Sequence, residues 1–376
     1  MTEILALFMI VQFFGLFVAT FSTTPVQTII IGNSSSSSLF SNPLILAIYD
    51  VVAIAVFAVL ILAILRVYKN KGALLFRFIE AFAVGFGTAA MFFFIFATIF
   101  YTANVLYTAG AAVVLSAAVV IAKNKVRSLR NFAALTSSIG LGVMIGAYGF
   151  SLAYVFMFIM AIYDYIAVFV TKHMLALAKA ASNENLSLLI GSSNVEVMPK
   201  AQTNRKMVAE LKNEIKKNQI KDPIIRKIID SGEMPVLSQI QLGAGDLTLP
   251  LVMSVGLFIS LFNYYLAVVA AIGAVAGLVT TMWLLKRYSV ALPAIPPLFA
   301  VMNFFVGIGM LTYSKPMSFL SGIGITSGTT AEYYKFAFGM IVVGVVFMLI
   351  MIITLERNRS RQKKGGASHG KPAQKP

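Results

Sequence analysis

The sequence contains no cysteine and only two histidines, His173 and His369. Without cysteine the chain has no disulfide, no thiolate metal site and no cysteine nucleophile. With only two imidazoles, a Ser-His-Asp site or a histidine-based metal site has little support. We therefore expect no bound metal and no cofactor.

Charged residues are also scarce. They make up 12% of the chain, whereas soluble domains average about 25%. Hydrophobic residues make up 59%, and the mean hydropathy is +0.87. This composition excludes a soluble globular protein and favours one all-α, polytopic transmembrane bundle. A membrane helix needs about 20 mostly apolar residues. Ten such spans are predicted, at 4–22, 44–65, 79–101, 105–122, 132–150, 152–171, 245–263, 266–285, 292–313 and 336–355.

The basic residues are distributed unevenly around these spans. If the spans alternate across the bilayer, 28 of the 30 Lys and Arg residues fall on one side. Only Lys315 and Lys335 fall on the other side. Cytoplasmic loops carry such an excess of Lys and Arg. The net charge of +16 therefore reflects membrane topology, not nucleic-acid binding, and both termini are expected in the cytoplasm.

Polar segments divide the chain into five parts. Residues 1–171 hold six spans, and 172–240 form a basic cytoplasmic loop with helical stretches expected near 172–182 and 203–219. Residues 241–313 hold three more spans. An external loop at 314–335 then leads to the tenth span and a basic cytoplasmic tail, both within 336–376.

Four carboxylates lie inside the predicted spans or at their edges: Asp50, Glu80, Asp164 and Asp246. A carboxylate inside a span costs roughly 2.5–3.5 kcal/mol, so such residues are functional candidates. Asp164 and Asp246 come to a similar depth near the cytoplasmic side, on consecutive antiparallel spans. Asp50 is about 24 Å from that side, too far to pair with Asp246. Glu80 lies at the cytoplasmic boundary, where a snorkelling or ion-paired acid is the simpler interpretation.

Short motifs surround the pair Asp164 and Asp246. Tyr163 precedes the first aspartate, and the second closes the sequence Gly-Ala-Gly-Asp at 243–246. Glycines there allow close backbone approach. A strand-like lead-in at 236–242 precedes these glycines. The sequence Pro-Ala-Ile-Pro-Pro at 293–297 opens the ninth span, and such backbone is tolerated in lipid only beside protein or a water-filled cavity.

These motifs resemble those of the presenilin and signal peptide peptidase family, the GxGD intramembrane aspartyl proteases. The resemblance covers about residues 1–313 and includes the order, span numbers and orientation of the motifs. Ile295 departs from the leucine of the family's Pro-Ala-Leu motif, and the span at 336–355 adds a tenth to the family's nine. The run at 246–250 looks more like the signal peptide peptidase branch and microbial, archaeal-type homologues.

The resemblance implies a nine-span presenilin-like core and an aspartic endopeptidase with a water nucleophile. Its substrates would be transmembrane helices of membrane proteins or signal peptides, which must unwind and could pair with the strand-like lead-in as an added strand. The cell membrane of a microbe is the expected location. Accessory subunits, a homo-oligomer, and the base and acid roles of the two aspartates stay open. The implied site consists of catalytic Asp164 and Asp246, motif residues Tyr163, Gly243 and Gly245, and substrate-binding Leu242, Pro293, Ala294 and Ile295.

Three other functions were weighed against this one. A prepilin-peptidase-type aspartic protease also uses Gly-x-Gly-Asp, but it lacks the proline motif. A proton- or cation-coupled transporter could use the four carboxylates as a relay. Transporters often have matching broken helices in two halves, whereas this sequence has one proline-rich break and no clear counterpart. A catalytically silent scaffold would not need both aspartates.

Overall fold

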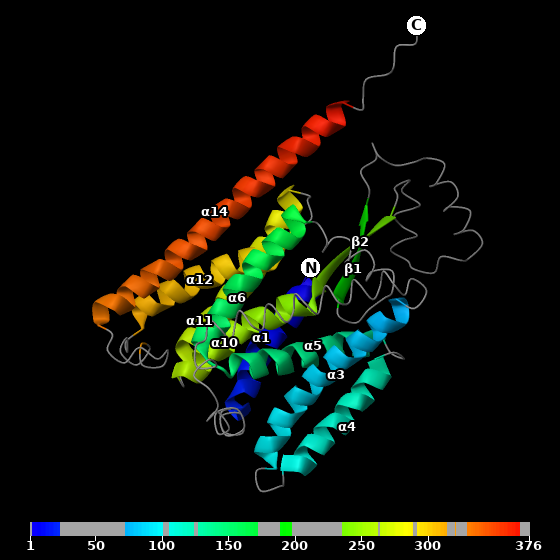
Figure 1. The fold of residues 1–376 in the computed structure, drawn as a ribbon. Coiled ribbons are helices and arrows are strands. Elements are labelled where there is room, and N and C mark those ends of the chain that lie inside the picture. The colour runs from blue at the N-terminus through cyan, green and yellow to red at the C-terminus, as the bar shows by residue number, and fades with distance from the viewer. Residues whose placement is uncertain are drawn as a thin grey trace, which may run out of the picture. The chain divides into compact units, whose positions relative to one another are not determined.

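The computed structural model describes residues 2–22, 72–100, 105–123, 127–171, 189–197, 235–261, 264–288, 292–313, 320 and 329–368. These residues form long helices and one small sheet (Figure 1). The helices are α1 (Thr2–Ser22), α3 (Gly72–Ile99), α4 (Val105–Lys123), α5 (Arg127–Gly146), α6 (Phe150–Tyr165), the π-helix η2 (Ile166–Val170), α10 (Ala244–Leu261), α11 (Tyr264–Tyr288), α12 (Ile295–Thr312) and α14 (Thr330–Ser368). The strands are β1 (Leu189–Val197) and β2 (Pro235–Gly243).

The predicted polytopic helical fold is confirmed. Nine of the ten predicted spans coincide with helices, and eight of these helices are long and apolar enough to cross a membrane. The tenth prediction, 44–65, lies outside the described residues, as does Asp50.

Helix α5 is present but is less apolar than a typical membrane span, so it is not among those eight. Three polar side chains in its middle, those of Thr136, Ser137 and Ser138, are buried inside the protein. Thr136 shares a hydrogen bond of 3.1 Å with Thr88 of α3, and Ser138 donates one of 3.3 Å to the carbonyl of Ala244 in α10. Because these groups are satisfied internally, a polar helix is compatible with this position.

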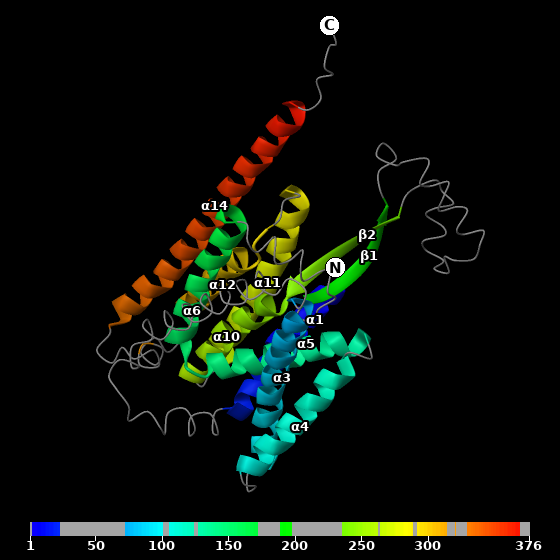
Figure 2. The ribbon, with the colours of Figure 1, turned by 45° about the vertical axis from the view of Figure 1, so that its right-hand side comes forward.

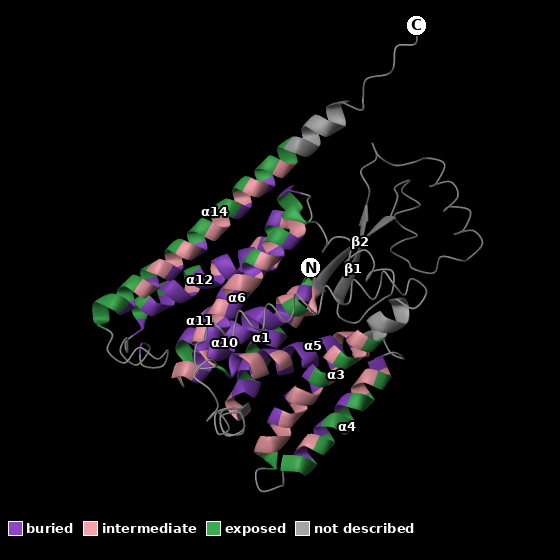
Figure 3. Cartoon of the chain, viewed as in Figure 1, coloured by how far each residue is buried: buried purple, intermediate pink, exposed green. Residues whose placement is uncertain are grey.

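Helix α10 is the most completely buried of the eight membrane helices (Figure 3). It packs against α5, α6 and α11. Leu251 fits against Gly142 of α5 and Gly15 of α1, and Gly256 lies against the backbone of α6 at Gly149 and Phe150. Small residues at helix contacts allow the close backbone approach that drives packing in lipid. The position of α10 is thereby fixed from three sides.

Helix α14 begins at Thr330, six residues before the predicted span. A reciprocal cap explains the early start: the backbone N–H of Thr329 donates to Glu332, and that of Glu332 donates to the Thr329 hydroxyl. The helix packs along α12, where an added Cβ at Gly307 or Gly344 would collide with the partner backbone. The two helices are therefore held together by close glycine contacts.

Strands β1 and β2 form a two-stranded sheet within the polar part of the chain. Strand β2 confirms the strand-like lead-in predicted at 236–242, whereas β1 was not predicted. The helical stretches expected near 172–182 and 203–219 lie outside the described residues. The chain divides into two structural units, one with Met1–Ile4 and Ile190–Leu242, the other with Leu5–Leu189 and Gly243–Pro376. Both candidate aspartates belong to the second unit.

Helix α3 packs against both α4 and α5 (Figure 2). Its contact with α4 includes an ion pair between Glu80 and Lys123, whose nitrogen and oxygen lie 2.7 Å apart. The two side chains are only 7% and 2% exposed. Glu80 is therefore ion-paired, as one of the two interpretations of its position predicted, and it is buried instead of snorkelling.

The contact between α3 and α5 is a close crossing at two glycines. A Cβ at Gly140 would collide with the carbonyl oxygen of Gly87 and would lie 2.7 Å from the backbone nitrogen of Met91. Backbone atoms cannot move aside as the end of a flexible side chain can, so the helices would have to separate. We expect Gly140→Ala to lower the free energy of unfolding by about 2 kcal/mol, measured by thermal unfolding of the purified protein in detergent.

Gly110 of α4 provides the matched control, because a Cβ there meets no atom within 4 Å. Gly110→Ala should leave stability unchanged or raise it by up to about 1 kcal/mol through helix propensity. Equal shifts for the two variants would show that α3 and α5 do not cross at Gly87 and Gly140.

Candidate active site

Asp164 lies next to the end of α6, which finishes at Tyr165 and continues directly into the π-helix η2. Its side chain is buried, with 5% exposed. A buried carboxylate needs hydrogen bonds to offset its lost hydration. Single π-helical turns inside α-helices are rare and are frequent at functional sites. The helix therefore carries a local irregularity directly beside its buried acid.

The partners of Asp164 come from the start of α12. The backbone N–H of Ile295 donates to Asp164 Oδ2 at 3.2 Å, and the N–H of Ala294 also donates to this carboxylate. Pro296 and Pro297 follow and have no N–H to offer. The two N–H groups at this helix N-terminus are thus both directed at Asp164, where the helix dipole also favours a negative charge.

Asp246 lies in the first turn of α10 and is half-buried. Its Oδ2 accepts a hydrogen bond of 3.2 Å from the backbone N–H of Gly243, the last residue of β2. The acid therefore caps its own helix. Strand β2 ends at Gly243 and α10 begins at Ala244, so Asp246 lies three residues after the end of the strand.

The two glycines of the motif play different parts around Asp246. A Cβ on Gly243 would lie 3.3 Å from Asp246 Oδ2, close to the atom that accepts the capping hydrogen bond. A Cβ on Gly245 would meet no atom within 4 Å, and Gly245 is exposed. Gly243 therefore lies against the capping carboxylate, whereas Gly245 lies on the exposed side of the helix start.

Two buried polar side chains hold the first turn of α10 in place. Ser138 of α5 donates to the carbonyl of Ala244, as described above, and Gln12 of α1 donates to the carbonyl of Leu247 at 3.1 Å. Neither residue was predicted from the sequence. Polar side chains inside otherwise apolar predicted spans were the available signal, because such groups in lipid usually face the bundle interior.

Asp164 and Asp246 are close enough for their charges to interact. They come from consecutive predicted spans, and each is held by backbone N–H donors. Within the described ranges no three His, Asp or Glu side chains gather closely enough to hold a metal ion. What this arrangement can do chemically is share and transfer a proton between two carboxyl groups, one buried and one half-buried.

The sequence matches a family described as signal-peptide peptidase, presenilin aspartyl protease over residues 5–314. The chain belongs to this family. It is therefore a multi-pass integral membrane protein of an aspartic intramembrane protease family, as the motifs and apolar helices indicate. The match ends before α14, so that helix lies outside the part shared with the signal-peptide peptidase and presenilin family.

A solved structure described as a presenilin family intramembrane aspartate protease is also similar to this chain. The TM-score is 0.47 and the sequence identity 16%, over 80% of this chain and 96% of the other. No curated protein matches the sequence.

The structure of this family member brings together some of the predicted site residues. Asp164 contacts the motif at 293–295 directly, and Asp246 contacts Gly243. Tyr163 is half-buried on α6, and Leu242 belongs to β2. Glu80 is paired with Lys123 elsewhere, which argues against a relay through all four carboxylates.

Proposed function

We propose that Asp164 and Asp246 form the catalytic dyad of an aspartic endopeptidase that cleaves peptide bonds within transmembrane segments. The observation that carries this proposal is the buried carboxylate of Asp164, which accepts a hydrogen bond from Ile295 of the proline motif and lies in the same structural unit as Asp246, near enough for an electrostatic interaction. Family membership supports the reaction class, and the two sequence motifs together with the burial of Asp164 support the choice of residues. No cofactor takes part in the proposed reaction.

Two interacting carboxylates share one proton and titrate as a pair. The ionised member takes a proton from a water molecule, and the protonated member donates a hydrogen bond to the scissile carbonyl. Water attacks the carbonyl carbon to form a gem-diol, and a proton passes to the departing nitrogen as the C–N bond breaks. Because the proton is shared, the base and acid roles belong to the pair.

A substrate helix hides its carbonyls in internal hydrogen bonds, so it must unwind before attack. Strand β2 pairs with β1 on one edge and leads directly to Asp246. We infer that the unwound segment adds to this sheet as a further strand. Leu242 and the side chains of the motif at 293–295 would then contact substrate.

The proposed setting is a bilayer with both termini in the cytoplasm, because the basic loops require this orientation. The substrates are transmembrane helices of membrane proteins or signal peptides. The proposed location is the cell membrane of a microbe. The proposed activity covers the protein alone and the protein with accessory subunits.

An isotope experiment tests the reaction directly. Purified protein in lipid vesicles would receive a peptide that spans the bilayer once, in water enriched in ¹⁸O. We expect a cut inside the apolar span, a free amine on one fragment, and one ¹⁸O atom in the new carboxylate of the other. Cleavage confined to the peptide's soluble ends would refute intramembrane proteolysis. The variant with both Asp164→Asn and Asp246→Asn serves as the control for contaminating proteases, and it should give no product.

A further inference from the structure

Helix α14, which lies outside the family match, contacts α6 directly beside Asp164. The hydroxyl of Tyr165 and the hydroxyl of Thr354 in α14 are 2.8 Å apart. Thr354 also donates to the carbonyl of Ile350, at 2.8 Å. A threonine hydroxyl has one proton, so Tyr165 is the donor and Thr354 the acceptor. This hydrogen bond ties the last residue of α6 to the added helix.

Apolar contacts reinforce this hydrogen bond. Tyr165 packs edge-on against Phe169 of η2, with ring centroids 5.2 Å apart. Phe169 and Leu292 both pack against a buried cluster to which Leu355 of α14 belongs. Leu292 directly precedes the motif that donates to Asp164. The added helix therefore contacts both halves of the Asp164 environment, the end of α6 and the approach to α12.

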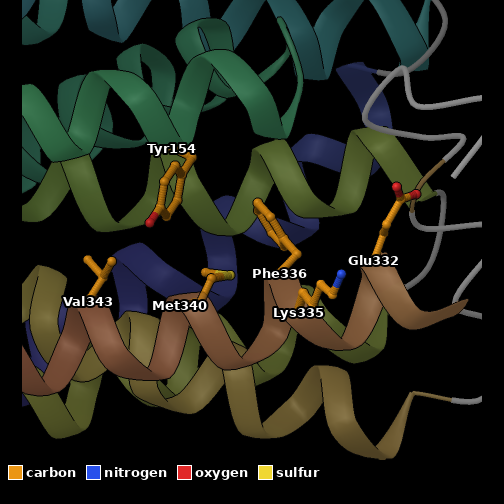
Figure 4. Close-up of a pocket in the computed structure, with 7 residues that line it drawn as sticks. Tyr154, Glu332, Lys335, Phe336, Met340 and Val343 are labelled. Carbon is orange, nitrogen blue, oxygen red and sulfur yellow. The ribbon is translucent and has the colours of Figure 1, made fainter. Parts of the chain in front are cut away.

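Side chains of α6 and α14 also meet farther from Asp164. Phe150 and Tyr154 of α6 both lie against Phe336 of α14, with ring centroids 6.5 Å apart in each pair. An open groove of about 480 Å³ lies beside this contact, lined by Tyr154 and by residues of α14 from Glu332 to Val343 (Figure 4). Farther along, Phe158 of α6 packs edge-on against Phe347 of α14 at 5.7 Å. Ring contacts between the two helices thus extend from Phe150 to Phe158, and the hydroxyl pair of Tyr165 and Thr354 adds a polar contact at the end of α6, beside Asp164.

We propose that Thr354 and Tyr165 are positioning residues that fix the end of α6, so that Asp164 stays beneath the N–H groups of Ala294 and Ile295. The π-helical turn that follows Tyr165 makes such support necessary, because the regular hydrogen-bond ladder is interrupted there. This inference rests on the proposed function for its effect on catalysis. The contact itself can be tested without activity.

Hydrogen exchange supplies the test that does not depend on activity. Within residues 293–297 only Ala294 and Ile295 have amide protons, because the other three residues are prolines. Thr354→Val removes the acceptor and keeps the shape of the side chain. We expect amide exchange at 293–297 to become about 5- to 10-fold faster, from the loss of one hydrogen bond. Unchanged exchange would overturn the proposal.

The kinetic test uses the same variant on the transmembrane reporter peptide. We expect kcat to fall about 10-fold with KM unchanged within about twofold, since misplacement of a catalytic group affects the transition state. Thr354→Ser retains the hydroxyl and should restore most of the rate. Tyr165→Phe should match Thr354→Val, and the double variant should be no slower than either, because both remove one interaction.

The chain contains a matched control for this pair. Tyr265 and Thr312 form the same kind of hydroxyl contact, and Thr312 likewise donates to a backbone carbonyl, that of Gly309. Thr312→Val should change neither exchange at 293–297 nor kcat. Equal effects of Thr312→Val and Thr354→Val would reduce the role of Thr354 to general stability and overturn the proposal. If exchange responds as expected but the wild type cleaves no reporter, the proposed function fails while the positioning contact stands.

Discussion

Replacing either Asp164 or Asp246 by asparagine is expected to lower kcat for reporter cleavage by about 10³-fold or more. Asparagine keeps the size of the side chain and one acceptor oxygen, so the hydrogen bonds from Ile295 and Gly243 can persist. It cannot share a proton with the remaining carboxylate. Positioned proton transfer contributes about 10²–10⁴-fold to catalysis, and the dyad loses it in either variant.

The measurement is the initial rate of cleavage of the transmembrane reporter by each purified variant in lipid vesicles. Asp50→Asn is the control, because the sequence predicts a different depth in the membrane for Asp50, and this variant should stay active. Equal activity in the wild type and all three variants would reveal a contaminating protease or a wrongly assigned site. Loss of activity in Asp50→Asn alone would remove Asp164 and Asp246 from the mechanism.

Breaking the buried ion pair in α3 and α4 is expected to have the largest effect on stability. Glu80→Gln leaves the ammonium group of Lys123 buried without a counter-charge, since its carboxylate partner at 2.7 Å is gone. Removing one member of a buried pair costs about 3–5 kcal/mol. We expect this loss in the free energy of unfolding, measured by thermal or denaturant unfolding of the purified protein in detergent.

A charge-free replacement provides the control for this prediction. The double variant Glu80→Leu with Lys123→Met removes both charges together, and apolar pairs of similar volume are often as stable as the ion pair they replace. It should recover most of the stability that Glu80→Gln loses. A Glu80→Gln protein as stable as the wild type would mean that Lys123 reaches water and that the pair is not buried.

Much of the membrane architecture could be predicted because lipid imposes strict local rules. Runs of about 20 apolar residues mark the spans, and the positions of Lys and Arg give their orientation. The same rules single out Asp164 and Asp246, because a carboxylate within a span is costly unless it faces the interior. Strand β2 was also predicted, from the short lead-in before the glycines.

Contacts between distant parts of the chain could not be predicted in the same way. Lys123 was interpreted only as part of a basic loop, yet it lies against Glu80, 43 residues away. The sequence gives no local sign that Gln12 reaches α10 or that α14 packs beside Asp164. These contacts depend on how helices pack, and apolar periodicity does not specify neighbours among helices that are apolar on most faces.

The role of the proline motif became clear only from the hydrogen bonds at the start of α12. A helix normally has four backbone N–H groups without internal partners at its N-terminus. Pro296 and Pro297 remove two of these donors, and Asp164 accepts from the donors of Ala294 and Ile295. The motif therefore offers two backbone N–H groups, and the Asp164 carboxylate uses both. Few donors remain at this helix start to bind another anion.

The π-helical turn after Asp164 has a consequence for comparing this chain with its relatives. A π-turn contains one residue more than an α-helical turn, and each residue of an α-helix advances about 100° around the axis. Residues from Ile166 onward, Phe169 among them, therefore face directions that an uninterrupted helix would assign to their neighbours. In a relative without the π-turn, an alignment should open a one-residue gap within 166–170. Residues after that gap should be compared at matched positions around the helix. This comparison would show whether the relative makes the same contacts.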